Sequence, residues 1–166
     1  MHDELTKVDI EKMQAEIDER KARNASLREN IRAARELGDL SENDEYRSAR
    51  REFGRNNSRI TYLENMIKTA IIIEDDSDED SVGLFDKVTV WYEDDEEERT
   101  IRLVTTLRND VLSDNISKES PLGVALMGRK EGDRVLIKVN EKVSYYVLIK
   151  KIEKSDEDPD IPISSF

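Results

Sequence analysis

The amino-acid sequence predicts an α+β protein in two parts, a long antiparallel helical hairpin and a small antiparallel sheet domain with one short helix. Two observations lead to this prediction. Apolar residues recur every three or four positions through the first 73 residues, and short alternating segments follow after residue 83. Only 36% of the 166 residues are hydrophobic, which suits a thin helical seam and a small core better than one large core.

The helical hairpin is predicted over residues 1–74, because two apolar series run toward each other around a central glycine. The first series is Ile10, Met13, Ile17, Arg20, Asn24, Leu27, Ile31 and Ala34, and the second is Tyr46, Ala49, Phe53, Asn56, Ile60, Leu63, Ile67 and Ala70. Each member of the first pairs with one of the second when their residue numbers sum to 80. This symmetry about residue 40 favours an intramolecular hairpin over a parallel dimer.

Two pairs in this seam contain polar residues. Asn24 meets Asn56, and two seam amides can hydrogen-bond each other and fix the register of the helices. Arg20 meets Ile60 and is expected to extend outward into solvent. About 30 residues per helix, at about 1.5 Å each, give an arm roughly 45 Å long.

The turn between the helices is acidic. Gly38 is expected to end the first helix in a left-handed conformation, and Ser41 is expected to cap the second. Asp39 then lies in the turn and Glu42 in the first helical turn, close enough to share one ion. Two carboxylates suit Mg²⁺, which prefers oxygen ligands and usually binds through one or two protein carboxylates.

The acidic run over residues 75–82 is predicted to be a solvated linker. Charge is unevenly spread, since residues 1–73 carry a net charge of −1 and residues 74–166 a net charge of −11. This balance argues against generic nucleic-acid binding by the whole chain. Residues 20–59 nevertheless hold 11 bases against 7 acids, which permits a local contact with a phosphate backbone.

The sheet domain is predicted over residues 83–154. Four strands are expected, over residues 85–92, 100–104, 134–139 and 142–152. Ser120 is expected to cap a short helix that Pro121 begins. The tail, residues 155–166, is rich in acids and proline and is predicted to be disordered.

Composition excludes several classes of protein. The chain has no cysteine, so neither disulfides nor thiolate metal sites are possible. Its first residues are polar and acidic, unlike a signal peptide, and no apolar run reaches the roughly 20 residues of a membrane helix. We therefore expect a cytoplasmic protein without membrane contact.

Two segments of the sequence resemble the bacterial Gre transcript-cleavage factors. Residues 34–46, with Gly38-Asp39-Leu40 at their centre, are similar to the family's tip motif. Residues 117–133, which contain Ser120 and Pro121, are similar to a motif of its C-terminal domain. The two segments lie in the family's order and spacing, so the resemblance covers nearly the whole chain.

The resemblance implies a coiled-coil arm followed by a small FKBP-like domain. It implies a monomeric transcription elongation factor that binds RNA polymerase and inserts the tip of the arm into the secondary channel. There the factor would stimulate the polymerase's own Mg²⁺-dependent hydrolysis of backtracked RNA, without being an enzyme by itself. By this resemblance Asp39 and Glu42 are the catalytic acids, and they would hold Mg²⁺ jointly with the polymerase.

The same resemblance assigns three further groups of residues. The first group, Asp44, Glu45 and Tyr46, would support the tip. The second, Arg35 and Arg50, would contact the RNA 3′ end. The third, Glu119, Ser120 and Pro121, would bind the polymerase. Each group also has a simpler explanation. Arginines are common as solvated helix charges, acids are favoured in the first turn of a helix by its dipole, and Ser-Pro is a standard helix start.

One tip residue departs from the family's pattern. Asp44 stands where the family usually has alanine, so the tip carries four acids. Acid-rich paralogues that enter the same channel inhibit the polymerase, which makes inhibition the alternative to cleavage stimulation. A coiled-coil scaffold or chaperone-like binder is an alternative from another class, although it leaves the Gly-Asp-Leu turn at the centre of pairing unexplained.

Overall fold

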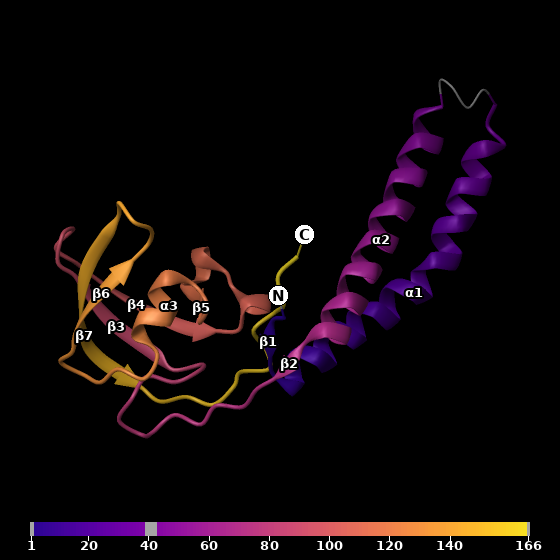
Figure 1. Cartoon of the computed structure of the whole chain (residues 1–166). Coiled ribbons are helices and arrows are strands. Elements are labelled where there is room, and N and C mark those ends of the chain that lie inside the picture. Colours follow the sequence, from indigo (N-terminus) through magenta and orange to yellow (C-terminus); the bar gives the residue numbers. More distant parts are fainter. Residues whose placement is uncertain (1, 39–42, 166) are drawn as a thin grey trace. The chain divides into compact units, whose positions relative to one another are not determined.

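The computed structural model describes residues 2–38 and 43–165, and the chain forms two compact units (Figure 1). The first unit contains Val8–Ala70, and the second contains Asp3–Lys7 together with Ile71–Ser165. The arm was predicted over residues 1–74, and the continuous part of the helical unit, Val8–Ala70, lies within that range. Among the described residues, no helix is long and apolar enough to cross a membrane.

The first unit is a helical hairpin. Helix α1 spans Lys7–Arg35 and helix α2 spans Asp44–Thr69, and the two run side by side in opposite directions (Figure 1). Most of their buried residues come from the two predicted series, namely Met13, Ile17, Leu27 and Ala34 in α1 and Asn56, Ile60 and Leu63 in α2, and Asp9 and Arg59 are buried as well. The seam is thin because each helix presents one narrow apolar stripe.

A polar cluster interrupts this seam. Asn56 Nδ2 donates to Asn24 Oδ1 over 2.9 Å, which confirms the predicted amide pair. The prediction for Arg20 is wrong, because its Nη1 donates to Asn56 Oδ1 over 3.1 Å and its Nε to Glu16 Oε2 over 2.9 Å. Arg59, only 2% exposed, also donates to Glu16 Oε2, over 2.7 Å. Arg20 thus finds partners at the seam and has no need to extend outward.

The second unit is built on a five-stranded sheet in the order β5-β4-β3-β7-β6. Its strands are β3 Lys87–Tyr92, β4 Glu97–Val104, β5 Asn115–Ser117, β6 Arg134–Lys138 and β7 Ser144–Glu153. The four predicted strands pair antiparallel, but β5 pairs parallel to β4, so the sheet is mixed rather than antiparallel. The fold class remains α+β.

The core of this unit lies between the sheet and helix α3, Pro121–Leu126. Alternate residues of the strands point into it, as the period of two requires. The sheet contributes Val88, Val90, Ile101, Leu103, Val135, Ile137, Val147 and Ile149, and the helix contributes Leu122 and Leu126. Two short 3-10 helices, Thr106–Arg108 and Val111–Ser113, connect β4 to β5.

A second, two-stranded sheet joins the segments that flank the hairpin. Strand β1, Glu4–Leu5, pairs parallel with β2, Ile71–Ile72, and Leu5 is fully buried. The Lys118 ammonium forms an ion pair with the Glu4 carboxylate. These contacts explain why residues 3–7 belong to the sheet unit rather than to the arm.

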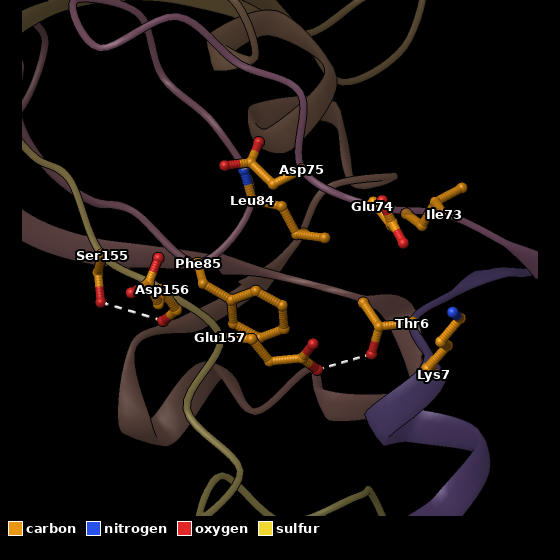
Figure 2. Close-up of a pocket in the computed structure, with 10 residues that line it drawn as sticks. All are labelled: Thr6, Lys7, Ile73, Glu74, Asp75, Leu84, Phe85, Ser155, Asp156 and Glu157. Carbon is orange, nitrogen blue, oxygen red and sulfur yellow. Dashed lines mark hydrogen bonds between the residues drawn. The ribbon is translucent and has the colours of Figure 1, made fainter.

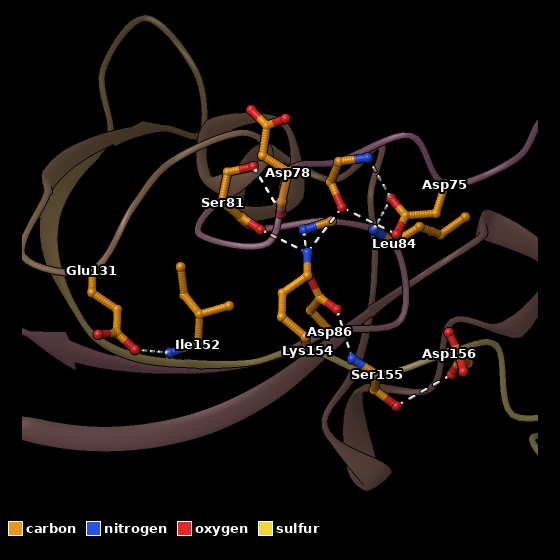
Figure 3. Close-up of polar contacts among 12 residues, drawn as sticks. Asp75, Asp78, Ser81, Leu84, Asp86, Glu131, Ile152, Lys154, Ser155 and Asp156 are labelled. Carbon is orange, nitrogen blue, oxygen red and sulfur yellow. Dashed lines mark hydrogen bonds and ion pairs between the residues drawn. The ribbon is translucent and has the colours of Figure 1, made fainter.

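The acidic linker is hydrogen-bonded to Lys154, whose ammonium also pairs with a buried aspartate (Figure 3). Lys154 Nζ lies 2.6 Å from Asp86 Oδ2, and Asp86 is fully buried. The same ammonium donates to the Ser81 carbonyl over 2.8 Å and to Ser77 Oγ over 2.9 Å. The linker, predicted to be solvated, is thus held at Ser77 and Ser81. Both serines supply oxygen acceptors to the Lys154 ammonium beside its ion-pair partner Asp86.

The prediction of a disordered tail is wrong for residues 155–165. Glu157 Oε2 accepts a hydrogen bond from Thr6 Oγ1 over 2.6 Å (Figure 2). It also accepts one from Arg108 Nη2, over 2.6 Å. Ile161 is 7% exposed and packs with Leu84, Phe85 and Val104. The composition of the tail gives no sign that Ile161 is buried or that Glu157 pairs with the buried Arg108. These two residues hold the tail in place.

Candidate functional site at the end of the arm

The predicted catalytic acids, Asp39 and Glu42, lie outside the described residues. The structure describes the chain on both sides of them. On one side α1 ends at Arg35, and Gly38 follows with a φ of +127°, in the positive range expected for this glycine. On the other side Asn43 immediately precedes α2.

Asn43 is the N-cap of α2, so the prediction that Ser41 caps this helix is wrong. Asn43 has extended backbone angles, and its Oδ1 accepts from the Tyr46 amide over 2.9 Å. Its Nδ2 donates to the Ala34 carbonyl over 2.6 Å. The predicted place of Glu42, in the first helical turn, lies outside the described residues. Asparagine ranks with serine as an N-cap, so the sequence contained this signal.

Two arginines contact the Tyr46 ring. The guanidinium carbon of Arg35 is 5.6 Å from the ring centroid and that of Arg50 is 5.8 Å away. Arg35 lowers the pKa of the Tyr46 phenol below its ordinary value, and Arg50 acts in the same direction. The structure thus brings together three predicted site residues from both helices. Each cation–π contact contributes about 0.5–1 kcal/mol at an exposed site.

The other predicted tip residues, Asp44 and Glu45, are exposed in the first turn of α2. The helix dipole favours acids at this end, so their position alone assigns them no further role. Among the residues that the structure describes, no three acids or histidines gather closely enough to hold a metal ion.

A basic surface continues along α2 from Tyr46. A shallow hollow of about 440 Å³ is lined by Tyr46, Arg47, Arg50 and Arg51. Sequence reasoning singled out Arg50 but not its two arginine neighbours, which appear in the sequence only as part of a generally basic segment. Closely spaced guanidinium groups around an aromatic ring are suited to a phosphate backbone and its bases.

The predicted polymerase-binding residues lie on the sheet unit, at the start of α3. Ser120 caps this helix, and its Oγ accepts from the Gly123 amide over 3.0 Å. Glu119 is exposed, and its carboxylate accepts a hydrogen bond from the Thr106 hydroxyl. Pro121 occupies the first helical turn and is exposed. The loop is therefore a well-ordered, capped helix start that leaves two of its three residues accessible.

Comparison with known families matches both units. A family described as "Transcription elongation factor, N-terminal" matches residues 4–72, and one described as "Transcription elongation factor, GreA/GreB, C-term" matches residues 76–154. The tail that packs through Ile161 lies beyond the second match.

Individual relatives cover most of the chain. Transcription elongation factor GreA of Thermotoga neapolitana is 42% identical over 147 residues, which are 88% of this chain and 94% of the relative. GreA of Geobacillus kaustophilus is 40% identical over 135 residues, 80% of this chain and 85% of the relative. A solved structure, GreA factor homolog 1 (Gfh1) of Thermus thermophilus, is 24% identical and covers 93% of this chain and 100% of its own, with a TM-score of 0.43.

Proposed function

Because the chain belongs to the Gre family of transcription elongation factors, we propose that it binds RNA polymerase and stimulates the polymerase's own hydrolysis of backtracked RNA. The observation that carries this proposal is the make-up of the arm's end. The four residues between the two long helices include two carboxylates in the sequence, and beyond them Tyr46 is contacted by two arginines.

The length of the arm would let its end reach a site far from the sheet unit. Helix α1 has 29 residues, and at about 1.5 Å per residue it is roughly 43 Å long. A paired helix of this length can carry its end into a channel too narrow for the sheet unit. The seam is satisfied within one chain, which supports action as a monomer.

Asp39 and Glu42 would act on the reacting phosphodiester. Their carboxylates are the oxygen ligands that Mg²⁺ prefers, and we assign them to a Mg²⁺ that the polymerase holds jointly with this chain. The ion would stabilise the attacking and leaving oxygens of the displacement. The polymerase remains the enzyme, and this chain contributes ligands that complete its site.

The arginines would hold the RNA. Arg35 and Arg50 both contact the Tyr46 ring, and they lie four residues before Asp39 and eight residues after Glu42 in the sequence. Their charge is matched to the phosphates of the RNA 3′ segment, and the ring offers a surface for base stacking. Local basic charge thus offsets the overall net charge of −12, which would otherwise repel RNA.

The sheet unit would dock on the polymerase through the start of α3. Glu119 and Pro121 are accessible for contact. The Ser120 hydroxyl is engaged in capping α3, so it would shape this surface rather than bind the partner directly. Binding and cleavage stimulation would then reside in different units of the chain.

A pair of matched double variants tests this function. Asp39→Asn with Glu42→Gln removes both tip carboxylates, and Asp18→Asn with Glu19→Gln makes the same chemical change at exposed positions of α1. In stalled polymerase complexes, the tip variant is expected to bind normally and to lose RNA 3′-fragment release, whereas the control keeps both. Fragment release by the tip variant at the wild-type rate would overturn the proposal.

A further inference from the structure

The Asn43 side chain joins the two helices at the end of the arm. Its Nδ2 donates to the Ala34 carbonyl over 2.6 Å, and its Oδ1 accepts from the Tyr46 amide over 2.9 Å. The last carbonyls of α1 and the first amides of α2 have no partner within their own helices. The Asn43 side chain therefore satisfies the Tyr46 amide of α2 and adds a second donor to the Ala34 carbonyl of α1, which also accepts from the Leu37 amide, so it bridges the two helices.

This bridge requires the chemistry of asparagine. The side-chain amide carries a donor and an acceptor on different atoms, so it can reach two backbone groups at once. An aspartate at position 43 would keep the acceptor for Tyr46 and lose the donor for Ala34. A serine would have to perform both tasks with one shorter hydroxyl. Capping and bridging are thus separable by substitution.

A second contact crosses between the helices at the same place. Arg35 is the last residue of α1, and its guanidinium lies 5.6 Å from the centroid of the Tyr46 ring on α2. Tyr46 is therefore held twice, by its backbone amide through Asn43 and by its ring through Arg35. Both contacts fix where α2 begins relative to the end of α1.

We propose that Asn43 is a positioning residue for the two tip carboxylates. Only four residues, 39–42, separate Gly38 from Asn43. In a connection this short, the separation of its two ends limits where Asp39 and Glu42 can be placed. A misplacement of about 1 Å can lower a reaction rate roughly 100-fold. The inference rests on the proposed function, and it adds a residue that neither binds the metal nor touches the RNA.

Three variants at this position separate bridging from capping. Asn43→Asp and Asn43→Ser both keep an acceptor for the Tyr46 amide, and only the former adds charge. At saturating factor we expect each to release 3′ fragments about 10- to 100-fold more slowly than wild type. The concentration for half-maximal effect stays unchanged, because polymerase contacts lie on the sheet unit. Asn43→Ala, which loses the cap as well, is expected to show the same loss and a lower helix melting temperature.

A physical readout tests the bridge independently of activity. The chain has no cysteine, so Ala33→Cys and Ser48→Cys, both at exposed positions, allow spin labels to be placed on the two helices near the tip. The distance distribution between the labels is expected to broaden in Asn43→Asp and Asn43→Ser, with the helical circular dichroism signal unchanged.

Two results would overturn the inference. The first is an unchanged distance distribution in both variants, which would mean that no bridge holds the helices. The second is a broadened distribution together with a wild-type rate of fragment release at saturation, which would mean that the Asn43 bridge is not needed to position the tip carboxylates for cleavage. If wild-type protein releases no fragments at all, the proposed function fails, and the distance measurement still decides whether Asn43 bridges the helices.

Discussion

Asn24 and Asn56 hydrogen-bond each other across the arm, with 2.9 Å between Asn24 Oδ1 and Asn56 Nδ2. Asn56 is 3% exposed, and it also donates to the Arg20 carbonyl over 2.9 Å. A slide of either helix would leave these buried groups without partners, which is costly. The pair therefore fixes the register, and the register decides which residues form the turn at the arm's end.

The first prediction concerns this amide pair. Asn56→Leu is expected to destabilise the arm by about 1–3 kcal/mol, because it removes the donor to Asn24 Oδ1 and the acceptor of Arg20 Nη1. Replacing both asparagines by leucine is expected to raise the melting temperature while allowing other registers or oligomers. Circular dichroism melts and sedimentation velocity measure the two effects. A double variant that melts below Asn56→Leu would contradict this interpretation.

The second prediction concerns acid pH. Partial burial raises the pKa of Glu16, but hydrogen bonds from Arg59 and Arg20 outweigh this effect, so the pKa lies below its ordinary value of 4.5. A depressed carboxyl pKa contributes stability that is fully present above the unfolded pKa and is lost as the pH falls through the folded pKa. The arm is therefore expected to lose stability as the pH falls below about 4.5.

Glu16→Gln tests this dependence directly. The variant removes a charged partner of the buried Arg59 and is expected to destabilise the arm by about 2–3 kcal/mol at neutral pH, at or below the lower end of the roughly 3–5 kcal/mol range for breaking a buried ion pair, because Glu16 is 24% exposed. Its stability should also vary less with pH on the acid side. Urea unfolding followed by circular dichroism at several pH values measures both, with the exposed Glu19→Gln as reference. If the stability of both variants depended equally on pH, a group other than Glu16 would be responsible for the loss of stability in acid.

The third prediction concerns the tail. Ile161→Ala is expected to destabilise the sheet unit by about 2–4 kcal/mol, because it opens a cavity beside Leu84 and Phe85. The chain's single tryptophan, Trp91, lies in β3 and reports unfolding of this unit alone. Denaturant unfolding followed by tryptophan fluorescence gives the change, and Asp160→Ala provides an exposed control in the same segment. An unfolding midpoint equal to that of the control would mean that the tail is not packed.

The fourth prediction separates the two units functionally. Glu119→Ala is expected to weaken polymerase binding by about 1 kcal/mol, or roughly fivefold, and to leave the cleavage rate at saturation unchanged. Ser120→Ala loses a helix cap and is expected to destabilise the sheet unit by about 1 kcal/mol. Titrating fragment release against factor concentration separates affinity from maximal rate. A lower rate at saturation for Glu119→Ala would place this residue in the reaction rather than in docking.

Much of the arm could be predicted because its seam residues recur every three or four positions. Residue numbers that sum to 80 placed Asn24 opposite Asn56, as the structure confirms. The same rule failed for Arg20, since a seam position was assumed to be apolar or solvated. In fact Arg20, Glu16 and Asn56 satisfy one another, together with Arg59, and cross-helix polar networks leave no signature in hydrophobic spacing.

The sheet unit was predictable only where its elements are long. Strands of five or more residues alternate visibly, whereas β5 has three residues and β1 and β2 have two each. Such short strands form because distant segments meet, as Glu4 does with Ile71. The tail shows the same limit, since its composition is that of a disordered segment, and among its described residues the buried apolar side chain is Ile161. At the tip, both Ser41 and Asn43 were suitable caps, and the cross-helix bond to Ala34 decides between them.

The most direct test of the central claim is fragment release by the wild-type protein from a backtracked polymerase complex carrying 3′-labelled RNA and Mg²⁺. Cleavage stimulation predicts rapid appearance of short labelled 3′ fragments, followed by renewed elongation when nucleotides are added. Slowed elongation without labelled fragments would contradict the account and identify an inhibitor, and no effect on either would leave the chain as a scaffold.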